Sequence, residues 1–219
     1  MLRHEPIARR DWLIPAGLLA LSFIPALAGT LRLIQLGTGA AITPENARFF
    51  AAPLPVVLHL VSSLLFCVLG AFQFVPGLRR SKPAWHRIAG RLLVPAGLIS
   101  AFSALWMTQF YPVGIESPAS FDGPMLYVIR LVAGAAMALS LVLGVAAILR
   151  RDIAQHKAWM MRGYAIGLGA GTQAFTHLPW FLFPDIQGEL ARTLCMGAGW
   201  AINLAVAEWF IARGRSHAQ

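Results

Sequence analysis

The chain has 219 residues, of which 58% are hydrophobic and only 12% are charged, whereas a soluble domain carries roughly 25% charged residues. This composition excludes an ordinary water-soluble domain, and it excludes intrinsic disorder because so apolar a chain must bury its surface. The 18 basic and 9 acidic residues leave a formal net charge of +9, which raises the question of an anionic partner, either nucleic acid or lipid.

Six apolar runs follow one another along the chain, and each is long enough to cross a bilayer as a helix of about 20 residues. They lie at roughly 12–36, 54–77, 88–111, 125–149, 159–183 and 191–212. The runs lack the period-two alternation of membrane barrel strands, and the segments between them are too short to hold a soluble domain. The sequence therefore predicts an all-α integral membrane protein in which residues 1–219 form one six-transmembrane-helix bundle.

Basic residues are divided unevenly between the two sides of these six crossings. All but four of the 18 fall on the side that holds both termini; the four on the other side are Arg32, Arg48, Arg130 and Arg192. Most acidic residues share that second side, namely Glu45, Glu116, Asp122, Asp185 and Glu189. The positive-inside rule then predicts cytoplasmic N and C termini. The excess charge is an orientation signal, so we expect the lipid bilayer as a partner and no nucleic acid.

Two of the predicted cytoplasmic turns resemble each other. Residues 78–87 read LRRSKPAWHR and residues 149–157 read LRRDIAQHK. The similarity predicts that spans 2–3 and 4–5 form a parallel repeat, related by an axis along the membrane normal. The register pairs His86 with His156, His59 with Arg130, and Met107 with His177.

The inner histidines, His86 and His156, lie at the cytoplasmic starts of spans three and five. These spans are diagonal in a four-helix core, so the two rings are candidates for the axial ligands of one haem b. Arg91 and Arg162 are placed to pair with its propionates. The competing interpretation is a pair of interfacial histidines in basic turns that contact lipid phosphate.

A glycine follows each of His59, His86 and His156 by eleven residues, which is three helical turns and returns to the same face. A missing side chain at that height leaves room for a flat macrocycle, although membrane helices also use glycine simply to pack closely. The glycines concerned are Gly70, Gly97 and Gly167.

The second span carries a polar stripe that should face the interior of the bundle. The stripe consists of His59, Ser62, Ser63, Phe66, Gly70 and Gln73. The alternative function is a small transporter-like or lipid-interacting bundle without a cofactor, with a polar outer cavity lined by His59, Gln73, Arg130, Gln173 and His177. A haem at this outer level needs His177 or Met107 as the second ligand beside His59.

Other kinds of chemistry have little support. No Walker loop, GxSxG elbow, HExxH or GxGxxG motif occurs, so no catalytic residues are assigned. Cys67 and Cys195 both lie in apolar runs, which predicts neither a disulfide framework nor a CxxC metal motif. Glu208, near the inner end of the last run, is expected to pair with a neighbouring arginine.

Three segments carry a resemblance to a known family. GAFQF at 70–74 after His59, HRxxGR at 86–91 and HKxWMxR at 156–162 resemble a bacterial family of predicted multi-pass membrane proteins of uncharacterised function. That resemblance implies the bacterial cytoplasmic (inner) membrane. More distantly, the histidines resemble those of membrane cytochromes b and ferric-reductase-like electron carriers. This second resemblance implies haem-based electron transfer with a quinone or redox partner and, if the protein is an enzyme, a membrane oxidoreductase.

Overall fold

A computed structural model describes residues 9–111 and 121–216, with side chains described for 11–111 and 121–214. Glu116, counted above among the outer acidic residues, lies outside these ranges. The described residues form helices and no strands. Five of the helices are long and apolar enough to cross a membrane, which confirms the all-α membrane class. They are α1 (Leu13–Thr38), α3 (Pro53–Ala71), α5 (Pro83–Phe110), α6 (Pro124–Leu149) and α10 (Glu189–Ser216).

Shorter helices connect or extend these five. α2 (Ala47–Ala51) lies between α1 and α3, and α4 (Pro76–Ser81) lies between α3 and α5. Three more precede α10, namely α7 (Ile153–Gly167), α8 (Gly169–Thr176) and α9 (Leu178–Leu182). Single 3₁₀ turns cover Arg9–Trp12, Phe72–Phe74 and Pro184–Ile186. We call the two ends of the bundle the α2 end and the α4 end after the short helices that they carry.

The sequence predicts one continuous helix over the apolar run at 159–183, but the structure divides this run into three helices. It is divided at Leu168, between α7 and α8, and again at His177, before α9. Pro179 explains the second break, because proline has no N–H to continue the ladder. At the first break, the carbonyl of Ala165 accepts a hydrogen bond from Asn203 of α10, and that of Gly167 accepts one from the Cys67 thiol. Side chains therefore satisfy backbone groups around the break, as an apolar environment requires.

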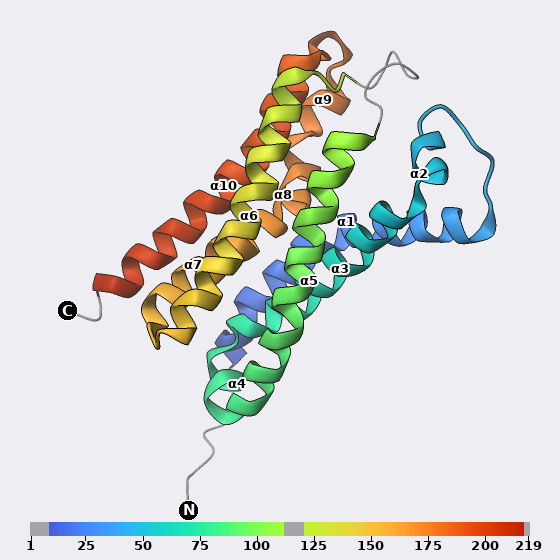
Figure 1. Cartoon of the computed structure of the whole chain (residues 1–219). Coiled ribbons are helices and arrows are strands. Elements are labelled where there is room, and N and C mark those ends of the chain that lie inside the picture. The colour runs from blue at the N-terminus through green and yellow to red at the C-terminus, as the bar shows by residue number, and fades with distance from the viewer. Residues whose placement is uncertain (1–8, 112–120, 217–219) are drawn as a thin grey trace, which may run out of the picture.

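The helices pack as neighbours in an order that follows the chain only in part. α3 lies against α5, α5 against α6, and α6 against α7, while α10 packs on α6, α7 and α8. α1 contacts both α3 and α8. Figure 1 shows that the α2 ends of α1 and α3 lean away from those of α5, α6 and α10, so that the bundle widens toward α2.

The core lies where α3, α5, α6 and α7 cross. Phe66, Leu93, Met137, Leu141 and Tyr164 are buried there, and the Tyr164 hydroxyl donates to the Cys67 carbonyl over 2.7 Å. The helices can come this close because Gly70 and Gly97 have no side chain where Tyr164 and Leu141 pack.

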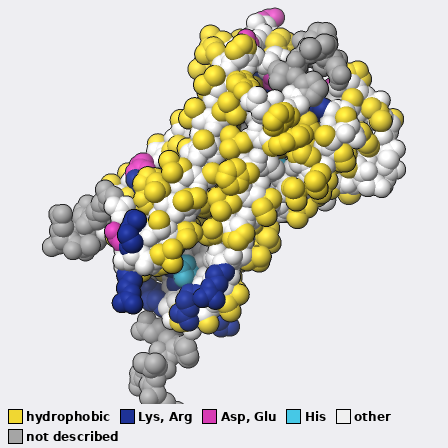
Figure 2. Space-filling view, viewed as in Figure 1, with side chains coloured by type: hydrophobic (Ala, Val, Ile, Leu, Met, Phe, Trp, Pro, Cys, Tyr) yellow, Lys and Arg dark blue, Asp and Glu magenta, His cyan; other side chains and the backbone are white. Residues whose placement is uncertain are grey.

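The outer surface of the bundle is apolar. The face shown in Figure 2 carries hydrophobic side chains over its middle, while Lys and Arg gather near the α4 end. Of the most apolar 18-residue stretch of α1, only 11% is buried within the protein, and for α10 the share is only 17%. Such exposure suits contact with lipid chains, since large apolar patches are rare on monomers in water.

Gly97 offers a test of how closely this core is packed. A Cβ on Gly97 would lie 2.7 Å from Cδ1 of Leu141 and 2.8 Å from Cε2 of Phe66, whereas one on Gly90 of the same helix would meet nothing within 4 Å. Overpacking costs about 1–3 kcal/mol. We expect Gly97→Val to lower the thermal unfolding temperature in detergent and Gly90→Val to leave it much less changed. Equal shifts for the two variants would contradict this packing.

Candidate functional site

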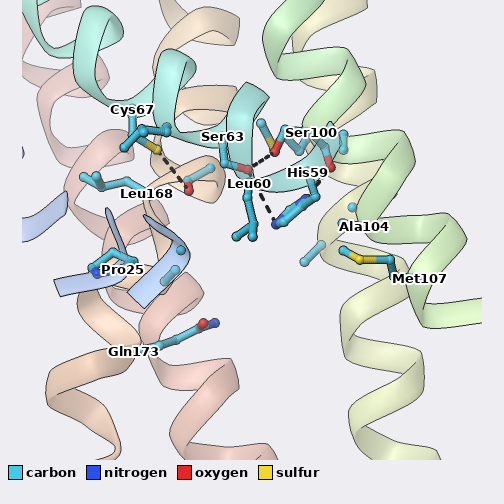
Figure 3. A pocket seen from close by; sticks show the side chains of 18 of the residues that line it. Pro25, His59, Leu60, Ser63, Cys67, Ser100, Ala104, Met107, Leu168 and Gln173 are labelled. Carbon is cyan, nitrogen blue, oxygen red and sulfur yellow. Dashed lines mark hydrogen bonds between the residues drawn. The ribbon is translucent and has the colours of Figure 1, made fainter. Parts of the chain in front are cut away.

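A cavity of about 390 Å³ lies in the α2 half of the bundle, lined mainly by α1, α3, α5, α6, α8 and α10, with further residues from α2 and α7. Its volume is within the range of pockets that hold small molecules. Figure 3 shows Pro25, His59, Met107 and Gln173 around it, contributed by four different helices. Of the residues predicted from sequence to line an outer cavity, His59, Arg130 and Gln173 do line it, and Ser63 of the same polar stripe lines it as well.

His59 lies in a small cluster of serines on the wall formed by α3 and α5. Its Nδ1 lies 3.0 Å from the carbonyl oxygen of Ser100, and its Nε2 lies 3.5 Å from the Ser63 hydroxyl. The Ser63 and Ser100 hydroxyls are 2.6 Å apart. Because a carbonyl only accepts, Nδ1 carries the proton and donates it to Ser100. Nε2 is then left as an acceptor beside Ser63, which is itself a cavity residue (Figure 3).

A network of charges lies at the α2 end of the cavity. Asp122, only 4% exposed, accepts from Arg130 Nη1 over 2.9 Å through one oxygen and from Arg192 Nε through the other. Burial alone would raise the pKa of Asp122, but the charges and hydrogen bonds of Arg130 and Arg192 lower it below its usual value. This carboxylate therefore joins α6 to α10 at the end of the cavity where Arg130 lies.

Arg48 of α2 is the second arginine on the cavity wall. Its guanidinium lies 4.9 Å from the centre of the Phe49 ring, and its Nε is buried without a hydrogen-bond partner among the described residues. Burial lowers the pKa of Arg48; Asp122 opposes this effect, while Arg130 and Arg192 add to it. Sequence reasoning placed Arg48 on the outer side but assigned it no role, since nothing in a single loop residue indicates which helices its side chain will face.

His177 and Gln73 do not line the cavity. His177 is buried, and its Nδ1 donates to the Gln173 carbonyl one turn earlier, over 2.8 Å. It thereby adds a side-chain hydrogen bond to a carbonyl that already accepts from the His177 backbone N–H. Gln73 lies in the 3₁₀ turn that follows α3, and both polar atoms of its amide are buried without a partner among the described residues.

The predicted haem ligands lie near the α4 end. His156 Nδ1 donates to the Gly144 carbonyl over 2.9 Å, and His86 Nδ1 is buried without a partner within the described ranges. Arg91 is exposed. Arg162 makes two hydrogen bonds to the Glu208 carboxylate, which confirms the pairing expected for Glu208. Nowhere in residues 9–111 and 121–216 do three or more His, Cys, Asp or Glu side chains gather as a metal site.

The three glycines that follow histidines by eleven residues are in contact with side chains. A Cβ on Gly70 would collide with Tyr164, one on Gly97 with Leu141 and Phe66, and one on Gly167 with Phe66 and Met137. In this structure the spaces are filled by neighbouring helices. These glycines therefore allow the helices to pack closely, which is one of the two roles that the sequence offered.

Fold and cavity together define a multi-pass α-helical membrane protein with a largely apolar pocket among its helices, which also carries several polar side chains. Residues 56–211 match a family described as predicted membrane protein (DUF2306). The match covers more than two thirds of the chain, so the protein belongs to this family, whose function is unknown. This confirms the first of the two resemblances. No curated protein and no solved structure matches the chain significantly, and the resemblance to cytochromes b finds no support there.

Asp122 predicts a pH-dependent contribution to stability. A carboxyl group whose pKa is lowered by folding stabilises the protein above its unfolded pKa, and this contribution is lost as the pH falls through the folded pKa. Breaking a buried ion pair costs about 3 kcal/mol. We expect Asp122→Asn to lower the unfolding temperature by a constant amount between neutral pH and about pH 5, and the difference from the unmodified protein to shrink below about pH 4.

The control for this measurement is Asp185→Asn, which removes an exposed carboxylate from the same end of the bundle. It should change the unfolding temperature little. A difference between Asp122→Asn and the unmodified protein that grows as the pH falls would contradict the assignment.

Proposed function

We propose that this protein is a membrane-embedded binding protein of the transporter type, whose ligand occupies the cavity between α1, α3, α5, α6, α8 and α10. The observation that carries the proposal is the convergence of His59, Arg130 and Gln173 on one pocket from three helices far apart in the chain. Ionisable and polar side chains inside a membrane bundle are costly and mark ligand or ion pathways.

The chemistry of the wall supports a ligand-binding role over a packing defect. Empty cavities in proteins are apolar, whereas this one is bordered by two arginines, a histidine and a glutamine. His59 is held in one orientation by Ser100, and Gln173 donates from its amide to the Met196 carbonyl over 3.1 Å. Side chains fixed in this way present their remaining polar atoms at defined positions, which gives a site its specificity.

The proposed topology has six crossings, with α7 and α8 together forming the fifth around the break at Leu168. Both termini then face the cytoplasm of a bacterial cell, and the α2 end faces outward. Support comes from the arginines and lysines of the α4 and α6–α7 turns, because basic loops remain on the cytoplasmic side. The cavity lies in the α2 half, so it belongs to the outward-facing half of the bundle in this topology.

The parallel repeat of the α3–α5 and α6–α7 hairpins remains part of the proposal. The register pairs His59 with Arg130, and both side chains line the cavity. The pairing of Met107 with His177 gives weaker support, because Met107 lines the cavity and His177 does not. Binding sites of repeat-built membrane proteins typically lie where the two repeats meet.

Cysteine accessibility tests whether the cavity is open to water from outside. In a background carrying Cys67→Ser and Cys195→Ser, Ala104→Cys places a thiol on the cavity wall, since Ala104 lines it. The matched control is Phe102→Cys on the same helix, where the side chain is 58% exposed on the apolar surface. Thiols react as thiolates, which form in water and not in lipid.

We expect a membrane-impermeant thiol reagent added outside intact cells to label Ala104→Cys at least about tenfold faster than Phe102→Cys. Labelling of Ala104→Cys only after the cytoplasmic face is opened would contradict the outward orientation. Equal slow labelling of both variants would contradict an aqueous cavity.

A second candidate function is electron transfer through a b-type haem between His86 and His156. One observation favours it: the Nδ1 of His156 donates to a carbonyl, which is the usual arrangement for a ligating histidine. The buried Nδ1 of His86 has no such partner within the described ranges. Bound haem would supply one-electron transfer to a quinone or protein partner. The packed glycines weigh against it, because a macrocycle beside Gly97 or Gly167 would have to displace side chains.

An absorbance spectrum of protein purified from haem-supplemented cells decides this second candidate. Haem binding predicts a Soret band and sharp alpha bands after dithionite reduction. His86→Ala and His156→Ala should each abolish them, whereas His177→Ala, at the other end of the bundle, should leave them in place. A colourless preparation would contradict the haem hypothesis and leave the cavity proposal untouched.

A further inference from the structure

We infer that the cavity binds an amphipathic anion, a carboxylate or phosphate monoester on a single apolar chain, with its charged group between Arg48 and Arg130. The inference rests on the proposed function and adds the chemical class of the ligand. Three observations support it. One end of the cavity is charged and the other is apolar, the arginines at the charged end outnumber the carboxylates, and both cavity arginines have hydrogen-bond donors to spare.

The cavity changes in character along its length. On α6 the lining residues run from Arg130 at the α2 end through Gly134 to Met137, seven residues deeper. The deep end is closed by Cys67, Ile166 and Leu168 near the α7–α8 break. One end therefore suits a charged group and the other an apolar chain.

The positive and negative charges at the α2 end of the cavity do not balance. Each oxygen of Asp122 is already engaged, one by Arg130 and the other by Arg192. Arg48 makes no ion pair with any described carboxylate, and its Nε is buried without a partner. Three guanidinium groups thus surround one carboxylate, and half-burying the unpaired one is costly unless a further anion approaches.

Arg48 and Arg130 also have the hydrogen-bonding capacity that such an anion needs. A guanidinium carries five N–H donors in a planar fork that matches a carboxylate or phosphate. Arg130 uses Nη1 for Asp122, so donors remain on both arginines. Both residues lie on the cavity wall, whereas Arg192 does not, so the ligand's charge belongs between the first two.

The two unlike ends of the cavity exclude two simpler kinds of ligand. A small inorganic anion would leave the walls around Met137 and Leu168 unfilled, and a neutral chain would leave Arg48 without an ion-pair partner of its own. A single chain that ends in an anionic group satisfies both ends of the cavity. Fatty acids and lipid phosphates share this chemistry, and the probes below distinguish them.

Binding is measured by native mass spectrometry on the full-length protein in a neutral detergent. The probes are oleate, oleyl phosphate, oleyl alcohol and acetate, which vary the head group and the chain separately. We expect oleate or oleyl phosphate to bind at least about tenfold more tightly than oleyl alcohol, since hydrogen bonds to charged groups are the stronger ones. Acetate should not bind measurably. The tighter of the two anionic probes identifies the head group as a carboxylate or a phosphate.

Arg48→Gln should weaken the anionic probe about tenfold and leave oleyl alcohol unchanged. The matched control is Arg32→Gln. Arg32 stacks on the same Phe49 ring at 4.8 Å and carries the same charge at the same end, but does not line the cavity. It should leave all affinities within about twofold, because exposed charges contribute little. Equal loss from both substitutions would overturn the role of Arg48 by pointing to a general surface charge effect.

The outcomes separate this inference from the proposed function. If oleate and oleyl alcohol bind equally and Ala104→Trp, which fills the cavity, abolishes both, the cavity binds ligands but the anionic class is wrong. Acetate binding as tightly as oleate would overturn the apolar chain. If Ala104→Trp leaves the binding of every probe unchanged, the cavity is not the site and the proposed function fails as well.

Discussion

Polar groups in the apolar middle of this bundle must find their partners within the protein, because lipid chains offer no hydrogen bonds. That requirement ties helices to one another at defined points. His59 of α3 donates to the Ser100 carbonyl of α5, and Asn203 of α10 bonds both Thr172 of α8 and the Ala165 carbonyl of α7. The first link fixes one wall of the cavity. The second supports the break at Leu168, which gives α8 its separate position at the cavity edge.

Packing and charge then divide the bundle into two unlike halves. Where Gly97 lets Phe66 and Leu141 pack closely, the interior is filled. Toward α2 the helices diverge (Figure 1), and the interior holds the cavity instead. Asp122 joins α6 to α10 at that open end by engaging Arg130 and Arg192. A carboxylate held by two guanidinium groups thus adds a polar link to the apolar contacts of buried residues such as Tyr111 and Leu126 at the widened end.

The sequence predicts those residues of the candidate site that share one helix face, but not those that come from separate segments. His59 and Ser63 were predicted to face the interior because helical periodicity places them on one polar stripe, and both line the cavity. His177 shares a helical run with Gln173, yet the break in that run turns it to cap α8. Arg48, Asp122 and Arg192 come together from three separate segments. No local pattern links such residues, because their proximity exists only once α2, α6 and α10 are packed.

The sequence by itself determined the class of the protein and its apolar elements. Long runs of apolar residues have no stable state in water, and backbone in lipid has to be helical or closed into a barrel. It also determined the unequal charge of the two ends, since that is a property of the loops alone. The tertiary structure decided where the helices touch and where they separate. The same glycine spacing is compatible with holding a macrocycle or admitting a neighbouring side chain, and only the packed positions of Tyr164, Phe66 and Leu141 distinguish the two. Whether a polar stripe meets another helix or a cavity is likewise a matter of distance between helices, which periodicity does not contain.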